Sequence, residues 1–364
     1  MPTFKIDLNP KVLAWARAES RYKEDEVASI LGIKADDYLG WEQDGKEIKY
    51  SDVKKLAKLY KRQISTFFLE DVPTKTKTPT EYRNLTSSYH ELSKEAYLYV
   101  RRTSYYLELY REIQGEEVIR KQYEWLSKVR KHPGAQATLL RQILDAPLSE
   151  QRNNGTKPFK YWREKFEKEL NIFIFQFPLE EKEYDGFSYT VDGKPYGITL
   201  NSRIPDTRKV FTLFHELGHI IEGQSGICLV NHTTNNVEAK CNYFAAEFLM
   251  PEDQIIPVIS YNELKDNALG LGVSPEAYLI RLKTLKLIEP TLYKELKQVI
   301  NDKNRSYVKP KQDGGPPPLV TVKSQRGEKF FDFVLSQFDS GKMSPSLVRD
   351  VLGIRVVGLS RQDN

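Results

Sequence analysis

The 364-residue chain has little cysteine and no long apolar segment. Two cysteines, Cys228 and Cys241, do not make a disulfide framework, so we expect both to be reduced, partly buried thiols. No stretch approaches the ~18 uninterrupted apolar residues of a membrane-spanning helix, and residues 1–30 lack the apolar run of a secretion signal. These absences argue against a disulfide-rich secreted scaffold and a membrane protein, and they predict a cytoplasmic location.

Excess positive charge is also lacking where a DNA-binding domain would need it. The formal net charge is +5, from 55 basic and 50 acidic residues. Residues 1–70 hold 13 basic residues against 12 acidic ones, whereas residues 72–170 hold 19 against 13. Because affinity for nucleic acid comes mainly from Lys and Arg neutralising phosphates, the amino-terminal segment does not have the composition of a dedicated DNA-binding domain.

Two histidines lie one helical turn apart in the apolar run VFTLFHELGHII of residues 210–221. Because residues i and i+4 of a helix project from one face, His215 and His219 can share a single ion. Glu216 points to the neighbouring sector, where it can hydrogen-bond a metal-bound water instead of the metal. A five-letter pattern of this kind also occurs without function, so its surroundings decide the interpretation.

The surroundings favour a metal. Two imidazoles and a carboxylate on a mostly buried helix each need a partner, since an uncompensated buried polar or charged group costs on the order of several kcal/mol. A divalent cation satisfies all three together. The expected helix also has a start signal at residues 205–207 and a stop signal at Gly223.

Hydrolytic zinc sites usually have three protein ligands and leave the fourth position to water, so a third ligand is needed. Residues 237–250, which precede Pro251, have apolar side chains at helical spacing. Glu238 lies on the flank of that stripe, in line with Cys241 and Asn242, and we predict that it is the third ligand. The alternative is a solvated glutamate that the helix dipole stabilises.

These motifs carry a resemblance. HELGH, followed by E-x-x-x-N-x-F-A-A-E-x-L-M-P at residues 238–251, resembles the ImmA/IrrE group of zinc metallopeptidases, and residues 186–219 are similar to that family's two strands and helix. The resemblance implies that His215, His219 and Glu238 bind Zn²⁺ and that Glu216 is the general base. The family pattern usually has alanine where this chain has Cys241, which we expect to serve packing.

The resemblance further implies an endopeptidase that cleaves a partner protein: a regulator, repressor or antitoxin. Glu216 would take a proton from the zinc-bound water and pass it to the leaving amine. Residues 196–201 alternate with period two, which predicts either a strand edge that pairs with an extended substrate or an ordinary sheet edge. Five residues could stabilise the oxyanion, and the sequence does not distinguish them: Tyr184, Tyr189, Tyr196, His232 and Tyr243.

Residues 9–73 have the pattern of five short helices and resemble an Xre-type helix-turn-helix domain. Its third helix would be the one offered to a DNA major groove. Lys34 and Tyr38 could reach bases or phosphates there, but Asp36 and Asp37 lie beside them. A weak DNA binder and a protein-docking module therefore both remain open.

We predict a mostly α fold with a small β-sheet (α+β). A five-helix helix-turn-helix domain, residues 1–73, precedes a helical linker region, residues 74–155, and a zincin-like metallopeptidase domain, residues 156–310. After the Gly- and Pro-rich breaker, residues 319–364 form a small segment with two helices joined by Ser340-Gly341. In the linker region, four interleaved basic and aromatic residues could bind nucleic acid: Arg101, Arg102, Tyr105 and Tyr106. Packing of a helix on its neighbour is the commoner role of such a stripe.

A second hypothesis is a helix-turn-helix DNA-binding regulator or antitoxin-like protein whose zinc domain is a scaffold or sensor without hydrolysis. In a third, the helix-turn-helix delivers the peptidase to its target. The complete HExxH and glutamate set and the near-neutral amino-terminal segment favour the peptidase.

Overall fold

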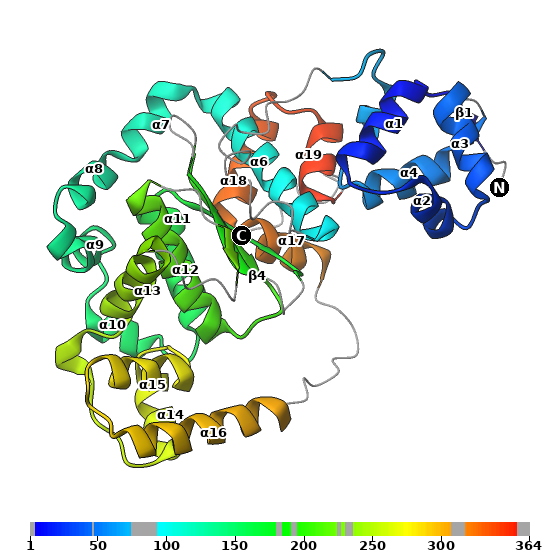
Figure 1. The fold of residues 1–364 in the computed structure, drawn as a ribbon. Coiled ribbons are helices and arrows are strands. Elements are labelled where there is room, and N and C mark those ends of the chain that lie inside the picture. Colours follow the sequence, from blue (N-terminus) through cyan, green and yellow to red (C-terminus); the bar gives the residue numbers. More distant parts are fainter. Residues whose placement is uncertain are drawn as a thin grey trace. The chain divides into compact units, whose positions relative to one another are not determined.

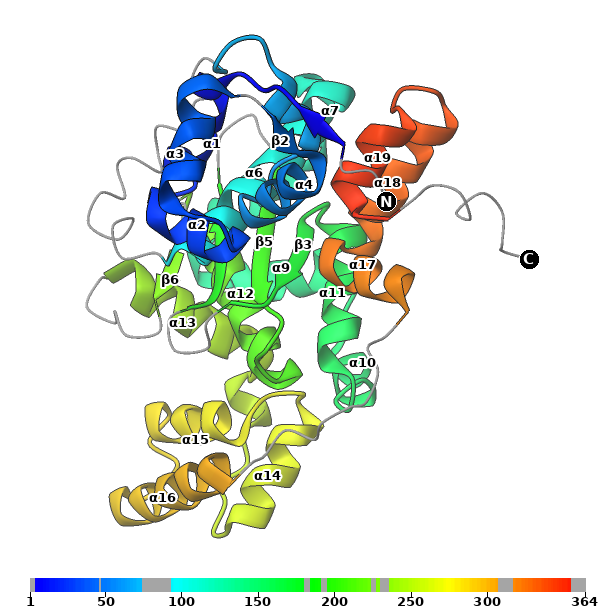
Figure 2. The same cartoon turned by 90° about the vertical axis from the view of Figure 1, so that its right-hand side faces the viewer.

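A computed structural model describes residues 4–45, 47–73, 93–179, 184–190, 195–223, 227–229, 236–306 and 317–354. The described chain is mostly helical with a small sheet, as predicted (Figures 1 and 2). It forms two compact units: residues up to Tyr106 together with those from Ser344 onward, and residues Leu107–Met343. Among the described residues, no helix combines the length and the apolar character needed to cross a bilayer.

The first unit begins with helices at all five expected places, the last of them a 3-10 helix. Its core encloses Tyr38, which is fully buried and shares a 2.9 Å hydrogen bond with the Tyr60 hydroxyl. The expectation that Tyr38 reaches DNA is therefore wrong, because its ring fills the core instead of the surface of the third helix. The elements are β1 (Lys5–Ile6), α1 (Pro10–Glu19), α2 (Glu24–Leu31), α3 (Ala35–Asp44), β2 (Ile48–Lys49), α4 (Tyr50–Leu59) and η1 (Ile64–Phe68).

The basic and aromatic residues of α6 (Lys94–Gln114) are used mainly for packing. Arg101 donates a hydrogen bond to the Tyr60 carbonyl, and Arg102 donates to the Tyr106 hydroxyl. Tyr106 is buried and in turn donates to the Val351 carbonyl of α19 (Pro345–Leu352) at 3.0 Å. These contacts support the packing interpretation of this stripe.

The second unit contains the sheet and the remaining helices. Helix α18 of this unit and helix α19 of the first unit confirm the two predicted C-terminal helices, and the Ser344 side chain caps α19 by accepting from the Leu347 amide at 3.2 Å. The helices are α7 (Glu116–Gln122), α8 (Glu124–Arg130), η3 (Pro133–Ala135), α9 (Gln136–Ile143), α10 (Leu148–Asn153), α11 (Pro158–Glu169), α12 (Asp206–Glu222), α13 (Asn236–Leu249), η4 (Glu252–Gln254), α14 (Tyr261–Gly270), α15 (Pro275–Thr284), α16 (Pro290–Ser306), α17 (Pro318–Arg326) and α18 (Glu328–Asp339).

The sheet has the strand order β3-β5-β4-β6. Strand β5 pairs in parallel with β3 and antiparallel with β4, and β4 pairs antiparallel with β6. The predicted edge at residues 196–201 is therefore wrong, because β5 is an interior strand. The strands are β3 (Phe173–Phe177), β4 (Tyr184–Tyr189), β5 (Gly197–Asn201) and β6 (Ile227–Leu229).

The polar residues of β5 explain the error. Thr199 and Asn201 are fully buried, so the alternation of apolar and polar residues does not mark a solvent-facing side. The Asn201 side-chain oxygen accepts hydrogen bonds from the Leu179 and Arg203 amides at 3.2 and 3.0 Å. At Gly197 an added Cβ would lie 3.0 Å from the Leu107 side chain, so a helix covers that face.

Helices α12 and α13 pack directly on each other in the second unit (Figure 1). An aromatic cluster joins them to α11. Phe214 of α12 stacks on Phe248 of α13 with ring centroids 4.3 Å apart. Trp162 of α11 contacts both rings edge-to-face, at 4.9 and 5.4 Å.

The carboxyl ends of both helices receive hydrogen bonds from side chains. Arg130 donates to the Ile220 and Ile221 carbonyls of α12 at 2.8 and 2.7 Å. At the end of α13, three side chains from separate elements donate to three successive carbonyls. These bonds are Arg141 to Phe248 at 2.5 Å, Gln151 to Leu249 at 2.8 Å and Arg281 to Met250 at 3.0 Å.

Arg281→Ala tests the strength of this arrangement. The Arg281 side chain is 1% exposed and also pairs with Glu247, so the substitution leaves a buried carbonyl and a carboxylate without their partner. We expect a loss of roughly 1–3 kcal/mol in the free energy of unfolding, mainly from the unpaired Met250 carbonyl, measured by urea denaturation. Lys283→Ala on the exposed face of the same helix is the control; it removes only a cation–π contact with Tyr293 and should change stability by less than about 1 kcal/mol. Equal effects of the two substitutions would contradict this account.

Candidate functional site

The HExxH motif lies in the buried middle of α12. The helix begins at Asp206 after Pro205 and ends at Glu222, where Gly223 adopts a left-handed φ of 71°, as the start and stop signals predict. His215, Glu216 and His219 are 5%, 0% and 3% exposed. Such burial requires a partner for each polar side chain.

The three predicted metal ligands lie together. The His215 and His219 Nε2 atoms are 3.1 Å apart. Glu238 reaches across from α13, with Oε2 at 3.2 Å from the His215 Nε2 atom and Oε1 at 3.2 Å from the His219 Nε2 atom. Within the described residues, these three side chains form a group that could hold a metal ion.

The distances suit a small tetrahedral cation. Zinc bonds to nitrogen and carboxylate oxygen are about 2.0–2.1 Å long, which makes the edge of a tetrahedron about 3.3 Å. The two nitrogens are 3.1 Å apart, close to that edge, and each lies 3.2 Å from a different oxygen of the Glu238 carboxylate. Three donors of this kind occupy one triangular face and leave a fourth position for another ligand.

Glu216 is a buried carboxylate beside this group. Neither of its oxygens has a hydrogen-bond partner among the described residues, and the Ser188 hydroxyl of β4, which faces it, does not close a well-aligned bond either. Burial raises the pKa of Glu216, while nearby His219, His215 and Ser188 act in the opposite direction. An orphaned carboxylate next to three metal donors fits a base that acts on a ligand of the metal.

The charges of the cluster are strongly coupled. Burial lowers the pKa of His219, but hydrogen bonds with Cys241 and Glu238 overcome this effect and raise the pKa to about 11. Burial raises the pKa of Glu238, but hydrogen bonds from His215 and His219 outweigh it and hold the pKa far below its usual range. The lowered pKa of Glu238 favours its ionised form, the form in which a carboxylate binds a metal ion.

Asn242 is a further site residue whose contact with His215 the sequence analysis did not predict. Its side-chain oxygen lies 2.9 Å from the His215 Nδ1 atom, so the ring can donate there while Nε2 faces the cluster. A second hydrogen bond of this kind fixes the orientation and tautomer of a metal-binding histidine. The sequence spacing could have identified Asn242 as a site residue, because it follows Glu238 by one helical turn and lies on the same face of α13.

The oxyanion-stabilising residue stays undecided among the predicted candidates. Tyr189 is buried and Tyr243 is 60% exposed, whereas His232 and the Tyr184 side chain lie outside the described residues. Tyr196 is buried, and its ring packs edge-to-face on Tyr123 at 4.5 Å.

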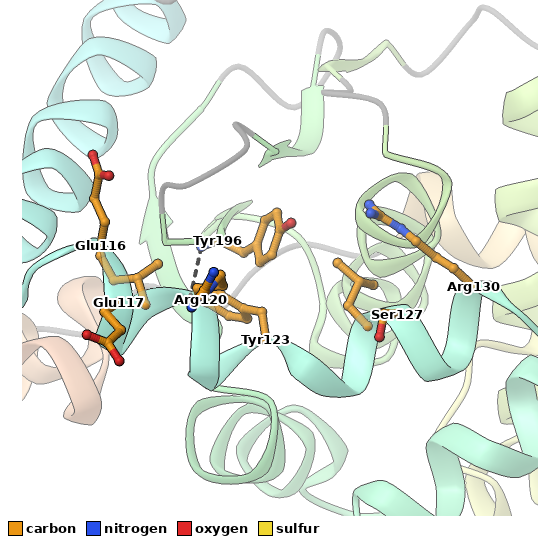
Figure 3. Close-up of a pocket in the computed structure, with 9 residues that line it drawn as sticks. Glu116, Glu117, Arg120, Tyr123, Ser127, Arg130 and Tyr196 are labelled. Atoms are coloured by element: carbon orange, nitrogen blue, oxygen red, sulfur yellow. Dashed lines mark hydrogen bonds between the residues drawn. The ribbon is translucent and has the colours of Figure 1, made fainter.

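Tyr196 also lines a cavity of about 610 Å³ between α7, α8 and the start of β5. Figure 3 shows the Tyr196 ring and the Arg130 side chain in this cavity, with Glu116 and Arg120 on its helical side. Since Arg130 also donates to the last carbonyls of α12, one wall of the cavity is joined to the helix that carries the histidines.

Comparison with known proteins gives one family. Residues 167–283, about a third of the chain, match the family model of peptidase family M78, described as the IrrE N-terminal-like domain. The match supports a metallopeptidase-type function for these residues, which include the whole histidine and glutamate cluster. It does not include the amino-terminal helices. No curated protein and no solved structure matches the chain.

Gly218→Ala tests the close approach of the two helices that carry the histidine and glutamate cluster. A Cβ at Gly218 would lie 3.0 Å from the Cys241 Cα and Cβ atoms, so α12 and α13 would have to move apart. We expect destabilisation by about 1–3 kcal/mol in thermal unfolding, together with weaker zinc binding in a chelator competition titration.

Gly270→Ala is the matched control, because a Cβ there meets no atom within 4 Å. It should leave zinc binding unchanged and stability equal or slightly higher. If Gly218→Ala behaves like Gly270→Ala, the two helices are not constrained at this point.

Proposed function

We propose that this protein is a zinc-dependent endopeptidase that cleaves a partner protein. His215, His219 and Glu238 would hold the metal, and Glu216 would be the general base. The main support is the convergence of three donor atoms from two helices, beside a fully buried carboxylate without a partner in the described chain. The peptidase family match at residues 167–283 supports the same conclusion.

The donor set favours zinc in a catalytic role. Two imidazoles and one carboxylate are typical ligands of hydrolytic zinc, whereas structural zinc sites are closed by four protein ligands. When bound, the ion would polarise the scissile carbonyl and lower the pKa of water at the site to about 7.

The residues of the chain would then carry the proton and hold the geometry. Glu216 takes the proton from the attacking water and returns it to the leaving amine, which prevents expulsion of an unstable amide anion. Asn242 keeps the His215 ring turned so that Nε2 faces the cluster. Burial of Glu216 and of both histidines keeps these groups away from bulk water.

The substrate would be a protein segment in extended form, as the resemblance implies for a regulator, repressor or antitoxin. Since β5 is interior, it offers no free backbone groups for pairing with such a segment. The outer strands of this sheet are β3 and β6. Since α17 packs against β3, addition of a substrate strand would use β6, the strand next to β4.

For the helices of the first unit we propose protein docking in preference to DNA binding. Asp36 and Asp37 are exposed at the start of α3, the helix that would enter a major groove. Arg17 donates to both oxygens of Glu42, so its charge is neutralised within the unit. This surface would repel phosphates, and a helix-turn-helix regulator with a non-hydrolytic zinc domain is the weaker candidate.

Glu216→Gln should abolish cleavage while zinc binding is retained. General acid–base catalysis contributes about 10²–10⁴ in rate, and the amide cannot accept the proton. The variant, expressed with an affinity tag in the native host, serves as a trap for the substrate, which is then incubated with wild type. Bound zinc is measured by elemental analysis, with one ion per chain expected in both proteins.

Glu222→Gln, at the exposed end of the same helix, is the control and should cleave as wild type does. His219→Ala should lose both zinc and activity. A Glu216→Gln variant that cleaves the trapped partner at the wild-type rate would show that the assigned base is wrong.

If the first unit docks proteins, the chain should show no DNA affinity of the kind that decreases steeply as the salt concentration rises. Residues 1–70 are nearly neutral, so few counterions would be released on contact with a duplex. Electrophoretic mobility shifts with genomic fragments between about 50 and 200 mM salt measure this dependence. A sequence-specific shift that weakens about 10³-fold or more over that interval would favour the regulator instead.

A further inference from the structure

Two arginines of the first unit contact α1 one helical turn apart. The Arg62 guanidinium lies over the Trp15 ring, with its carbon atom 4.0 Å from the ring centroid. Arg101 of α6 donates to the Glu19 carbonyl at 3.4 Å, and Glu19 follows Trp15 by one turn of α1. Arg101 also donates to the Tyr60 carbonyl, two residues before Arg62. Contacts with the same helix and the same short segment therefore bring the two guanidinium groups close together.

A third arginine adjoins this pair. The Arg21 guanidinium lies over the Tyr97 ring, 4.0 Å from its centroid, and Tyr97 precedes Arg101 by one turn of α6. The side chains of Arg21, Arg62 and Arg101 are all partly exposed. We call these three residues the arginine cluster. It lies entirely within the first unit.

The charge of the cluster is not neutralised by an ion pair at its centre. The Arg62 Nε–H group is buried and has no hydrogen-bond acceptor in the described part of the chain. The acceptors of Arg101 are two carbonyl oxygens and the Ser20 hydroxyl, not carboxylates. Burial and then the charge of Arg101 lower the pKa of Arg62 to about 9, and the more distant Glu19 carboxylate opposes this in part. Because like charges held in such surroundings cost free energy, an anion from outside the chain would be stabilised there.

We propose that the arginine cluster binds an acidic segment of a partner protein, whose carboxylates pair with Arg62 and Arg101. This inference rests on the proposed docking role of the first unit, and it names the place and the chemistry of the contact. It does not depend on zinc or on peptidase activity.

Guanidinium groups held in this way suit a carboxylate ligand. Each presents N–H donors in a planar fork that matches the two oxygens of a carboxylate. The Trp15 ring fixes the plane of Arg62, and the Glu19 and Tyr60 carbonyls fix Arg101, so little side-chain entropy is lost on binding. Arginine, tryptophan and tyrosine are also the residues that contribute most of the binding energy at protein interfaces.

Nucleic acid fits the cluster less well. Single strands bind by stacking bases on aromatic faces, but Tyr97 is buried and one face of Trp15 is covered by Arg62. A duplex would meet the exposed carboxylates of Asp36 and Asp37 on the same unit. A peptide with one or two carboxylates needs only the cluster itself.

The test compares Arg62→Met with Lys11→Met in the full chain. Each substitution removes one positive charge, and Lys11 is exposed on α1 about two turns before Glu19. Dissociation constants for a hexaglutamate peptide are measured by titration calorimetry at low ionic strength, with hexalysine as the peptide that should not bind. We expect Arg62→Met to weaken hexaglutamate binding about 10–100-fold, the effect of losing a charged hydrogen-bond donor. Lys11→Met should stay within about three-fold of wild type.

Thermal unfolding without peptide separates binding from a structural role. Methionine keeps the apolar contact with Trp15 and removes the charge, so Arg62→Met should unfold at the wild-type temperature or above it. A lower unfolding temperature together with wild-type affinity would show that Arg62 is structural and would overturn the proposal.

Arg62→Lys carries the test if the methionine variant does not fold. Lysine keeps the charge but lacks the planar fork, so hexaglutamate should bind several-fold more weakly than to wild type. Unchanged affinity in Arg62→Lys would then count against the proposal.

The remaining outcomes distinguish this inference from the docking role. If wild type does not bind hexaglutamate, the inference is wrong, whereas the docking role is still tested by the salt dependence of DNA binding. If wild type binds a DNA duplex in place of hexaglutamate, and Arg62→Met weakens that binding, the cluster recognises phosphates and both proposals fail.

Discussion

The direct packing of α12 on α13 is the constraint on which the rest of the candidate site depends. Each helix alone offers an incomplete set of donors: two imidazoles on α12 and one carboxylate on α13. They converge because Gly218 lets the helices approach and because Phe214 stacks on Phe248. The site is therefore a property of the helix interface, and the chemistry of each side chain follows from its place in that interface.

Interactions outside the site hold this interface in position. Arg130 bonds the end of α12, while Arg141, Gln151 and Arg281 bond the end of α13. These donors come from α8, α9, α10 and α15, so much of the second unit is tied to the two ligand-bearing helices. Hydrogen bonds to the terminal carbonyls also place positive charge at the negative ends of both helix dipoles. The surrounding fold thus fixes the axial position of the helices.

The sequence could predict those parts of the site that depend on spacing within a helix. His215 and His219 lie on one face because residues i and i+4 of any helix do so. Glu238 was predicted from its place beside the apolar stripe of α13. Contacts between different helices and strands were harder to predict from the sequence. Residues 196–201 were predicted to form a sheet edge because their period-two pattern does not reveal that β5 pairs with β3 on one side and β4 on the other. Tyr38 looked exposed for a similar reason, because its partner Tyr60 belongs to another helix. The contact of Asn242 with His215 also needed the packing of α12 and α13.

Ligands from two separately anchored helices have a consequence for the exchange of the ion. If both histidines and the carboxylate belonged to one flexible loop, each side chain could swing away in turn and release the metal quickly. Here the rings are buried and the helices that bear them are held at their carboxyl ends. Departure of an ion bound at the proposed site would then require the interface itself to open, so such an ion would exchange slowly with the surrounding solution.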